Sequence, residues 1–301
     1  MERHSSAMER INPKSQSGVN DPEAVSVESA CSDHGAIDAW LRFHEEQKNT
    51  PMSISPTKRL SRYSESFFHR ITKELAPKLR HSNPVRLWSA GSGFDYVSLK
   101  LKATYGDSIE ITIFDVSREC ILANKRAFEE NGLRADFVVG DLFNATYVGE
   151  FDMVFNTGLL EHFQREEQEV LLRVFSDSLR PGGEYLTYVP YAGGRLYNRC
   201  MKRMKTRGVW QFGPETPIAT FRNLGSGDLI LKEEFPLDAL HQLTFLRPAY
   251  PLLGLAFLPA TAAVMRLPDI FEPSLMRLIG GYGLYARFEK PLKEGRDASS
   301  A

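Results

Sequence analysis

The sequence is poor in cysteine and carries no excess charge of either sign. Its three cysteines, Cys31, Cys120 and Cys200, are odd in number and far apart, which suits neither a disulfide framework nor a Cys-based zinc site. A reducing, cytoplasmic compartment is therefore expected. The 37 Lys and Arg residues stand against 38 Asp and Glu residues, a formal net charge of −1. No global field then draws the chain to nucleic acid, and we expect no nucleic-acid partner.

Long hydrophobic runs and metal-binding spacings are also missing. The most apolar stretch, Ala249 to Met265, is shorter than the ~20 residues that a membrane-spanning helix needs, and it contains Pro251 and Pro259. Met1 to Asp21 has no continuous apolar segment of the secretory type. We expect no stable membrane insertion. The seven histidines show no H-x-x-x-H pair and no Cys/His cluster, so we predict no metal site.

Composition changes along the chain divide it into segments. The first 35 residues contain no aromatic side chain and cannot bury enough apolar area to offset the entropy of ordering. Apolar residues at helical spacing follow, including Tyr63, Phe67, Ile71 and Leu75. We predict a disordered tail over 1–35, an N-terminal helical cover over 36–82, a ligand-binding core over 83–191, a substrate-binding insertion or cap over 192–279, a closing strand over 280–292 and a disordered tail over 293–301.

The region from Asn83 alternates short apolar runs with amphipathic stretches, which is typical of βαβ units on a parallel sheet. The predicted strands are 85–90, 109–114, 135–139, 151–155, 184–189 and, closing the sheet, 280–290. The predicted helices are 57–79, 95–105, 118–131 and 165–179. The fold class is therefore α/β.

A glycine pair follows the first strand of this region directly. Gly91-Ser92-Gly93 runs from the strand into a helix, so backbone N–H groups and a helix N-terminus face a ligand above the strand ends. A nicotinamide dinucleotide site would need a third glycine at position 96, which is Tyr96. No P-loop motif is present either.

Two carboxylates end the next two strands. Asp115 follows Gly93 by 22 residues, where a carboxylate can accept hydrogen bonds from both hydroxyls of an adenosine ribose. Asp141 ends the third strand and can hold an adenine amino group. Either residue taken singly is equally well a helix cap or a turn residue. Three such signals after three successive strands favour a nucleotide site.

These pieces resemble the class I S-adenosylmethionine-dependent methyltransferases. The matching segments are VRLWSAGSG, ITIFDVS, ADFVVGDLF, FDMVFNTGLLEHF and LRPGGEYLTYVP, with weaker support from GYGLYARFEKP. The resemblance implies a Rossmann-like three-layer sandwich with a mostly parallel seven-stranded sheet, whose pocket is covered by the N-terminal helices and the C-terminal insertion. It also implies S-adenosyl-L-methionine as cofactor and S-adenosyl-L-homocysteine as product. The cofactor-binding residues that it implies are Ser89, Ala90, Gly91, Gly93, Asp95, Asp115, Val116, Gly140, Asp141, Leu142, Asn156 and Thr157.

The chain departs from the family pattern at two positions. Ser89 stands where the first strand usually ends in an acidic residue, and Asp95 replaces the usual third glycine of the loop. The WSAG tetrapeptide is similar to the first motif of the chemotaxis-receptor methyltransferases, which carry an acid just after the loop. By that similarity, Asp95 is expected to contact the amino group of the cofactor.

The resemblance places the methyl acceptor beside Glu161 and His162, after the fourth strand. His162 is the predicted general base, because its ordinary pKa near 6.5 suits proton transfer. The alternative is that both residues only organise the loop. Four aromatic residues are predicted to line the acceptor pocket: Tyr63, Tyr188, Tyr191 and Trp210. The basic stretch 195–207 is either a solvated helix face or a site for an anionic acceptor.

The leading hypothesis for function is methylation of a small apolar or aromatic molecule, because the insertion is rich in Leu, Phe, Ala and Pro. Oxygen or nitrogen is the favoured acceptor atom. Methylation of a protein or peptide is the enzymatic alternative. A third hypothesis, motivated by Ser89 and Asp95, is a cofactor-binding regulator without catalysis.

Overall fold

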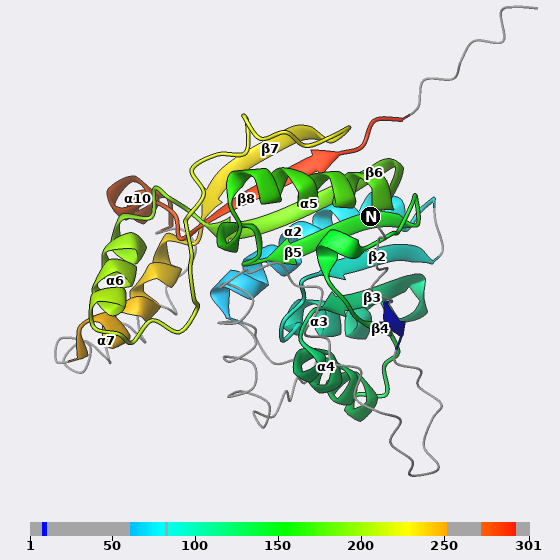
Figure 1. The fold of residues 1–301 in the computed structure, drawn as a ribbon, viewed down its shortest axis with the longest axis horizontal. Helices are drawn as coiled ribbons and strands as arrows, with labels where there is room; N and C mark the ends of the chain where they lie inside the picture. The colour runs from blue at the N-terminus through cyan, green and yellow to red at the C-terminus, as the bar shows by residue number, and fades with distance from the viewer. Residues whose placement is uncertain (1–7, 11–60, 82–83, 252–271, 293–301) are drawn as a thin grey trace, which may run out of the picture.

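The computed structural model describes residues 8–10, 61–81, 84–251 and 272–292, and its centre is a single β-sheet (Figure 1). The strand order is β1-β4-β3-β2-β5-β6-β8-β7. Strands β4, β3, β2, β5 and β6 run parallel, whereas β8 pairs antiparallel with both of its neighbours, β6 and β7. The strands are β1 Glu9–Arg10, β2 Val85–Ala90, β3 Ile109–Asp115, β4 Asp136–Val139, β5 Phe151–Thr157, β6 Leu179–Pro190, β7 Ile230–Leu237 and β8 Gly283–Glu289. Apart from the short β1, this is the predicted mostly parallel seven-stranded sheet.

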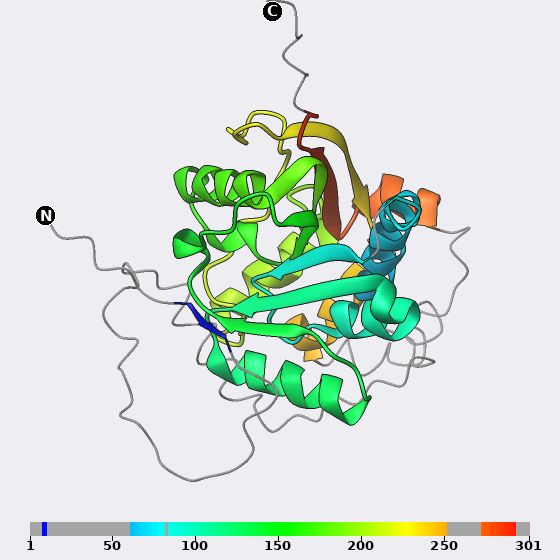
Figure 2. The ribbon, with the colours of Figure 1, turned by 90° about the vertical axis from the view of Figure 1, so that its right-hand side faces the viewer.

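Helices cover both faces of the sheet (Figure 2). Along β2, Val85 and Leu87 pack with α2, α3 and α4, whereas Trp88 and Ala90 pack with α5 on the other face. Side chains alternate between the faces of a strand, so one buried apolar strand supplies two cores. These helices are α2 Arg62–Lys78, α3 Tyr96–Tyr105, α4 Arg118–Glu130 and α5 Arg165–Ser178.

Local sequence fixes where these helices begin. The side chains of Ser61 and Ser117 accept hydrogen bonds from backbone N–H groups in the first turns of α2 and α4. Gln164 and Glu167 form a reciprocal capping box at the start of α5. Each interaction satisfies N–H groups that have no partner within the helix.

A second group of helices gathers beyond the end of β6. It consists of α6 Arg195–Thr206, η5 Ala239–Phe245, α7 Leu246–Ala249 and α10 Glu272–Ile279, and these elements contact one another (Figure 1). Single 3₁₀ turns follow other strands and helices, at η2 Gly106–Ser108, η3 Leu142–Asn144 and η4 Leu160–His162. In the described part of the chain, no helix is both long and apolar enough to cross a membrane.

The structure differs from the sequence prediction at the sheet edges. The predicted insertion 192–279 contributes β7, which pairs with β8 and forms an edge of the sheet. Within the predicted tail 1–35, β1 pairs antiparallel with β4, a pairing that the composition of this segment did not predict. The rest of that tail, residues 36–60 of the helical cover, most of the apolar stretch 249–265 and the tail 293–301 lie outside the described residues.

Candidate active site

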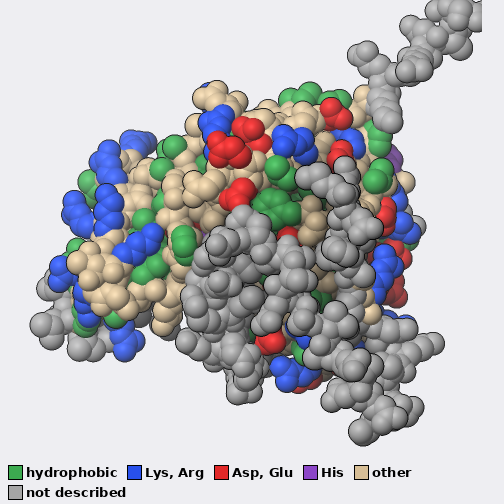
Figure 3. Space-filling model, viewed as in Figure 1, with side chains coloured by type: hydrophobic (Ala, Val, Ile, Leu, Met, Phe, Trp, Pro, Cys, Tyr) green, Lys and Arg blue, Asp and Glu red, His purple; other side chains and the backbone are tan. Residues whose placement is uncertain are grey.

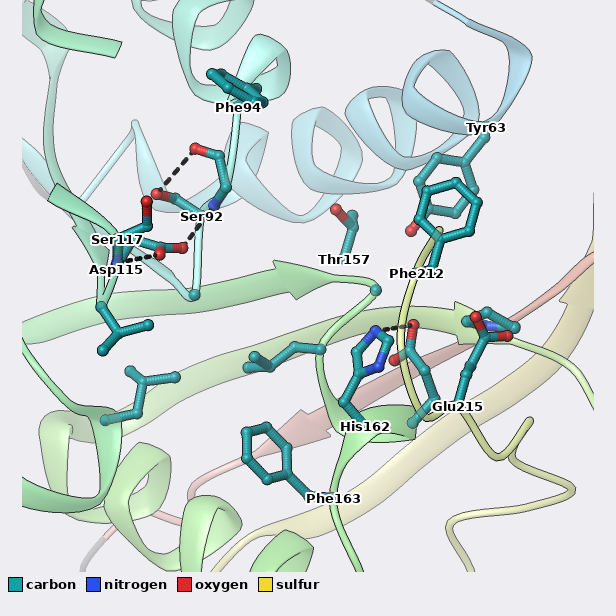
Figure 4. Close-up of a pocket in the computed structure, with 18 of the residues that line it drawn as sticks. Tyr63, Ser92, Phe94, Asp115, Ser117, Thr157, His162, Phe163, Phe212 and Glu215 are labelled. Carbon is teal, nitrogen blue, oxygen red and sulfur yellow. Dashed lines mark hydrogen bonds and ion pairs between the residues drawn. The ribbon is translucent and has the colours of Figure 1, made fainter. Parts of the chain in front are cut away.

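A cavity of about 340 Å³ lies at the carboxyl ends of the parallel strands. Its glycine-loop end is lined by residues that follow β2, β3 and β4: Gly91, Gly93, Asp115, Gly140 and Asp141. Its aromatic end is lined by Tyr63, Tyr197, Phe212, Phe245 and Tyr282. Figure 4 shows Asp115 and Ser92 on one side, Tyr63 and Phe212 on the other, and Thr157 between them. The cavity therefore joins the strand-end motifs to the second group of helices.

The glycine loop folds tightly against the neighbouring strand. The backbone N–H groups of Gly91 and Ser92 both donate to the carbonyl of Phe114, at 2.9 and 3.0 Å. Gly91 has a φ of 66°, and a Cβ there would lie 2.7 Å from Leu159 Cδ1. Both the left-handed backbone and the close approach require glycine.

Asp115 connects the end of β3 to this loop. Its Oδ2 accepts a 2.7 Å hydrogen bond from the Gly93 N–H, and its Oδ1 accepts a 2.8 Å bond from the Ser117 N–H. The residue is only 6% exposed, yet it lines the cavity. A carboxylate has about four acceptor sites, so the position suits a ligand with paired hydroxyls.

Gly140 and Asp141 form the next strand end. A Cβ on Gly140 would lie 2.8 Å from the buried Phe114 ring, so glycine lets this strand end pack closely against the core. Asp141 Oδ1 accepts a 3.0 Å hydrogen bond from the Phe143 N–H and caps η3. The capping interpretation and the ligand prediction are compatible, because Asp141 also lines the cavity.

The side chains of Ser89 and Asp95 face each other beneath the loop, and neither side chain faces the cavity. Asp95 is the N-cap of α3: its carboxylate accepts bonds from the Ser98 N–H at 2.8 Å and from the Ser89 hydroxyl at 2.5 Å. Its backbone N–H donates to Asn124, whose side chain in turn donates to the Gly93 carbonyl. Burial raises the pKa of Asp95, and its hydrogen bonds from Ser89 and Ser98 counteract this effect. Asp95 therefore positions the loop and does not line the cavity, whereas the resemblance implies that it contacts the amino group of the cofactor.

The aromatic end is a cluster of touching rings. The Tyr197 ring lies 4.8 Å from Phe245 and 5.0 Å from Tyr282, measured between centroids, and Tyr63 lies 5.4 Å from Tyr282. These rings come from α2, α6, η5 and the segment before β8. Parts of the chain that are distant in sequence thus build one apolar wall.

Glu161, His162 and Glu215 add polar groups to this wall. His162 Nδ1 lies 2.7 Å from the carbonyl of Pro214, which assigns the ring proton to Nδ1, and Nε2 lies 3.7 Å from Glu161 Oε1. Burial lowers the pKa of His162 from its ordinary value near 6.5 to about 4, which disfavours the predicted role as general base near neutral pH. Burial also raises the pKa of Glu161, helped by the nearby Glu215, and raises the pKa of Glu215 to about 7.

The structure brings most of the predicted site residues to the cavity. Those that line it are Tyr63, Gly91, Gly93, Asp115, Val116, Gly140, Asp141, Leu142, Thr157, Glu161 and His162. Those that do not are Ser89, Ala90, Asp95, Asn156, Tyr188, Tyr191 and Trp210.

Side chains in the second set have other partners. Asn156 is buried and bonds to Tyr185 and Thr187. The Tyr188 hydroxyl donates to Asp238 at 2.5 Å, and Trp210 donates to the carbonyl of Gly213. Ala90 and Tyr191 pack in the core on the α5 side. Ser89, Ala90, Asn156 and Tyr188 lie within strands, where side chains alternate between the two faces, so a position near a strand end did not suffice to bring them to the cavity.

Several lining residues are not among the site residues predicted from the sequence. Beside the glycine-loop end these are Ser92, Phe94, Ser117, Phe143 and Phe163, and towards the aromatic end they are Gly158, Leu159, Pro190, Tyr197, Phe212, Glu215, Phe245 and Tyr282. The first group adjoins recognised motifs, so proximity to those motifs was a usable signal. Most of the second group lies beyond β6, where no periodic pattern connects the residues to the strand ends.

The basic stretch 195–207 lies outside the cavity. Its helix α6 buries Tyr197, Cys200, Met201 and Met204, and its Lys and Arg side chains are exposed. Figure 3 shows Lys and Arg gathered over the end of the molecule formed by α6 and α7. The solvated-face interpretation fits this arrangement, because none of these cations lines the cavity.

Comparisons with known proteins agree with the sheet order and the strand-end motifs. Residues 89–183 match a family model described as a methyltransferase domain. Residues 89–183 therefore form a methyltransferase domain, in agreement with the resemblance to the class I S-adenosylmethionine-dependent methyltransferases. The [4+2]-cyclase SpnF shares its fold at 18% identity, over 86% of this chain and 95% of that one, with a TM-score of 0.51. A protein solved in work on the conversion of a disulfide bond into a thioacetal group during echinomycin biosynthesis shares it at 14% identity, over 80% and 88%, with a TM-score of 0.52.

A curated relative of this methyltransferase is the ribosomal RNA small subunit methyltransferase C of Pseudomonas entomophila. The two are 27% identical over 191 residues, which span 58% of this chain and 56% of that protein. The chain thus spans little more than half the length of this relative. SpnF is a cyclase, so the shared fold by itself does not define the substrate.

The glycine-loop end of this methyltransferase suits its cofactor, S-adenosylmethionine. A Cβ on Gly91 would enter the space beside Leu159 and Leu142, which line the cavity, and the carboxylates of Asp115 and Asp141 border the same cavity. Carboxylates accept hydrogen bonds from ribose hydroxyls and from an adenine amino group. The donor and acceptor chemistry of the cavity therefore matches the adenosine part of the cofactor.

Proposed function

We propose that this enzyme transfers the methyl group of S-adenosylmethionine to a small apolar or aromatic molecule. The observation that carries the proposal is the cavity itself: it runs from the glycine loop to a wall of touching aromatic rings. Rings of this kind bind apolar and aromatic ligands through large buried area. The acceptor is expected at the aromatic end, beside Glu161 and His162.

The glycine-loop end is the proposed cofactor site. Asp115 would accept hydrogen bonds from the ribose hydroxyls, Asp141 would accept one from the adenine amino group, and Leu142 would pack on the base. When bound, S-adenosylmethionine supplies a methyl group activated by a positively charged sulfur. The task of the protein is then to align the acceptor and to exclude water.

An RNA acceptor is the second candidate. It is favoured by the 27% identity to a ribosomal RNA methyltransferase and by the exposed cations of α6. Phosphate contacts from such cations would make RNA binding weaken steeply with salt.

One assay separates these possibilities. The enzyme is incubated with methyl-labelled S-adenosylmethionine and either a small-molecule extract, total RNA or total protein, and the label is divided into acid-soluble and acid-precipitable fractions. We expect a labelled product in the acid-soluble fraction from the extract, separated by chromatography from unreacted S-adenosylmethionine, which is also acid-soluble. Label precipitated with RNA or with protein would replace the proposal by that acceptor class. Cofactor binding without any transfer would favour the non-catalytic regulator.

A further inference from the structure

Two carboxyl groups are held in the apolar part of the cavity. Glu161 belongs to η4, directly after β5, and Glu215 belongs to the loop that follows α6. Both line the cavity, and Glu161 is only 3% exposed. Among the described residues, Glu161 Oε2 has no hydrogen-bond partner. A buried carboxyl oxygen without a partner is costly unless a ligand satisfies it.

Among the described residues, Lys205 is the cation whose charge favours ionised Glu215, and burial outweighs its effect on the pKa. No Lys or Arg there forms an ion pair with Glu161 or Glu215. Lys205 lies nearby, but its Nζ bonds to the backbone carbonyl of Glu215 and faces the Trp210 ring. His162 is neutral near pH 7, because burial lowers its pKa to about 4.

The groups around the pair suit a cation. The Tyr197 hydroxyl donates to Glu215, and the rings of Tyr63, Tyr197 and Tyr282 surround the same space. Aromatic faces carry negative electrostatic potential and attract ammonium groups. Figure 4 shows Glu215, Phe212 and Tyr63 at one end of the cavity, with His162 between them and the glycine-loop side.

The pair also lies next to the end of β5. A Cβ built on Gly158 would be 3.4 Å from Glu161 Oε1 and 3.7 Å from the Tyr63 hydroxyl. Gly158 follows Thr157, which lies between the two ends of the cavity in Figure 4. Glu161 is thus placed where the two ends meet.

We propose that the methyl acceptor is an amine, bound as an ammonium group between Glu161, Glu215 and the surrounding rings. This rests on the proposed function. One carboxylate takes a proton from the ammonium group, which leaves a neutral amine. The nitrogen lone pair then forms the N–CH₃ bond while the S–CH₃ bond breaks. The electron pair of the broken S–CH₃ bond stays on sulfur. The methylated ammonium product keeps the positive charge, and the pair holds the proton until it passes to solvent.

Another role for the pair is to hold the amino group of the cofactor, since Ser89 replaces the usual acid and Asp95 caps α3. S-adenosylhomocysteine carries this amino group and no methyl group. Sinefungin carries it too, and has a second ammonium group at the position of the transferred methyl. The difference in binding affinity between the two ligands therefore measures how strongly the site prefers a positive charge at the position of the transferred methyl group.

The test is calorimetric titration of both ligands into the wild-type chain, Glu161→Gln, Glu215→Gln and the control Glu166→Gln. Glu166 is an exposed residue in the first turn of α5. We expect wild type and control to bind sinefungin about tenfold more tightly than S-adenosylhomocysteine, as charged hydrogen bonds allow. The Gln variants should lose most of this preference and keep the affinity for S-adenosylhomocysteine. Two variants are used so that a folding failure in one leaves the other informative.

A preference for sinefungin that survives in both Gln variants overturns the inference. A loss of S-adenosylhomocysteine affinity in both, with folding intact, assigns the pair to the cofactor and also overturns it. Failure of the wild type to bind S-adenosylhomocysteine refutes the proposed function instead. As a second readout, the acid-soluble labelled product, once separated by chromatography from S-adenosylmethionine, should bind a cation-exchange resin at pH 7, whereas a neutral or anionic product contradicts an amine acceptor.

Discussion

At the scale of single residues, the two strand-end carboxylates are expected to contribute unequally. Asp115 is 6% exposed and bonds to backbone N–H groups on both sides of the cavity edge, at Gly93 and Ser117. Asp141 bonds within its own turn, to the Phe143 N–H and the Asn144 side chain. Ribose hydroxyls need an acceptor oxygen held in place, and Asp115 is the more firmly held group.

Asp115→Ala is expected to weaken binding of S-adenosylhomocysteine at least tenfold. Two hydrogen bonds to a charged group are lost, at ~1.5–3 kcal/mol each. Asp141→Asn should cause a smaller loss, since an amide oxygen still accepts a hydrogen bond. Calorimetry measures both, and Asp107→Ala, at an exposed position after α3, is the control. A larger loss in Asp141→Asn than in Asp115→Ala would reverse the ranking.

For His162→Ala, we expect weaker ligand binding and lower thermal stability, with the shape of the pH–rate profile unchanged. The ring bonds to the Pro214 carbonyl and is neutral, so its removal loosens the loop that carries Glu215. Steady-state kinetics from pH 5 to 9 and a melting curve test this. Loss of a limb near neutral pH, with a ~10²–10⁴-fold lower turnover and normal binding, would restore the general-base hypothesis.

At the scale of elements, the start of α3 shows how a cap organises a site. Asp95 caps the helix, bonds to Ser89 on β2, and binds Asn124 on α4 through its backbone N–H. One residue thereby fixes a strand, a loop and two helices relative to one another.

Asp95→Asn should keep the affinity for the cofactor, because asparagine caps helices about as well as aspartate. Asp95→Ala should lower the free energy of unfolding by about 1–3 kcal/mol, since the cap and the acceptor for buried Ser89 are both lost. Urea denaturation and calorimetry on both variants provide the measurement. A tenfold affinity loss in Asp95→Asn, with stability retained, would show that the carboxylate acts on the cofactor.

The sequence predicts some elements far better than others. Strands β2 to β5 are short apolar runs, and the first three are followed by glycine or acidic residues, so their strand-end motifs can be aligned from the sequence alone. Strand β7, ILKEEFPL, is a half-exposed edge strand with a proline, and shows no clear alternation. Phe212, Glu215 and Phe245 reach the cavity only through the packing of α6 and η5, which depends on contacts between distant segments.

At the scale of the whole molecule, buried histidines and buried carboxyl groups change the stability of the fold in opposite directions as pH changes. The pKa values of His162 and His241 are lowered to about 4 by burial, so their protonation in the unfolded chain costs stability as pH falls below about 6.5. Glu215 has a pKa raised to about 7, and Asp238 one raised to about 6, both by burial. These carboxyls stabilise the fold below about pH 4.5 and lose that effect as pH rises through their folded pKa values.

Glu215→Gln should therefore become more stable relative to the wild type as pH rises from 5 to 8, by at most about 3 kcal/mol. The groups that face Glu215 are Tyr197 and Lys205 of α6, Tyr63 of α2, Glu161 and Tyr282. Denaturation of both proteins without ligand, across this pH range, gives the difference. If the difference in the free energy of unfolding between the two proteins does not change with pH, the carboxyl of Glu215 does not have the raised pKa that burial gives it here.

We propose that one cavity holds the cofactor at its glycine-loop end and leaves its aromatic end for the acceptor. A crystal structure with S-adenosylhomocysteine tests it most directly. The account predicts ribose hydroxyls hydrogen-bonded to Asp115, the adenine beside Asp141 and Leu142, and the sulfur directed towards Glu161. Adenosine lying among Tyr197, Phe245 and Tyr282, or a ribose that makes no contact with Asp115, would contradict it.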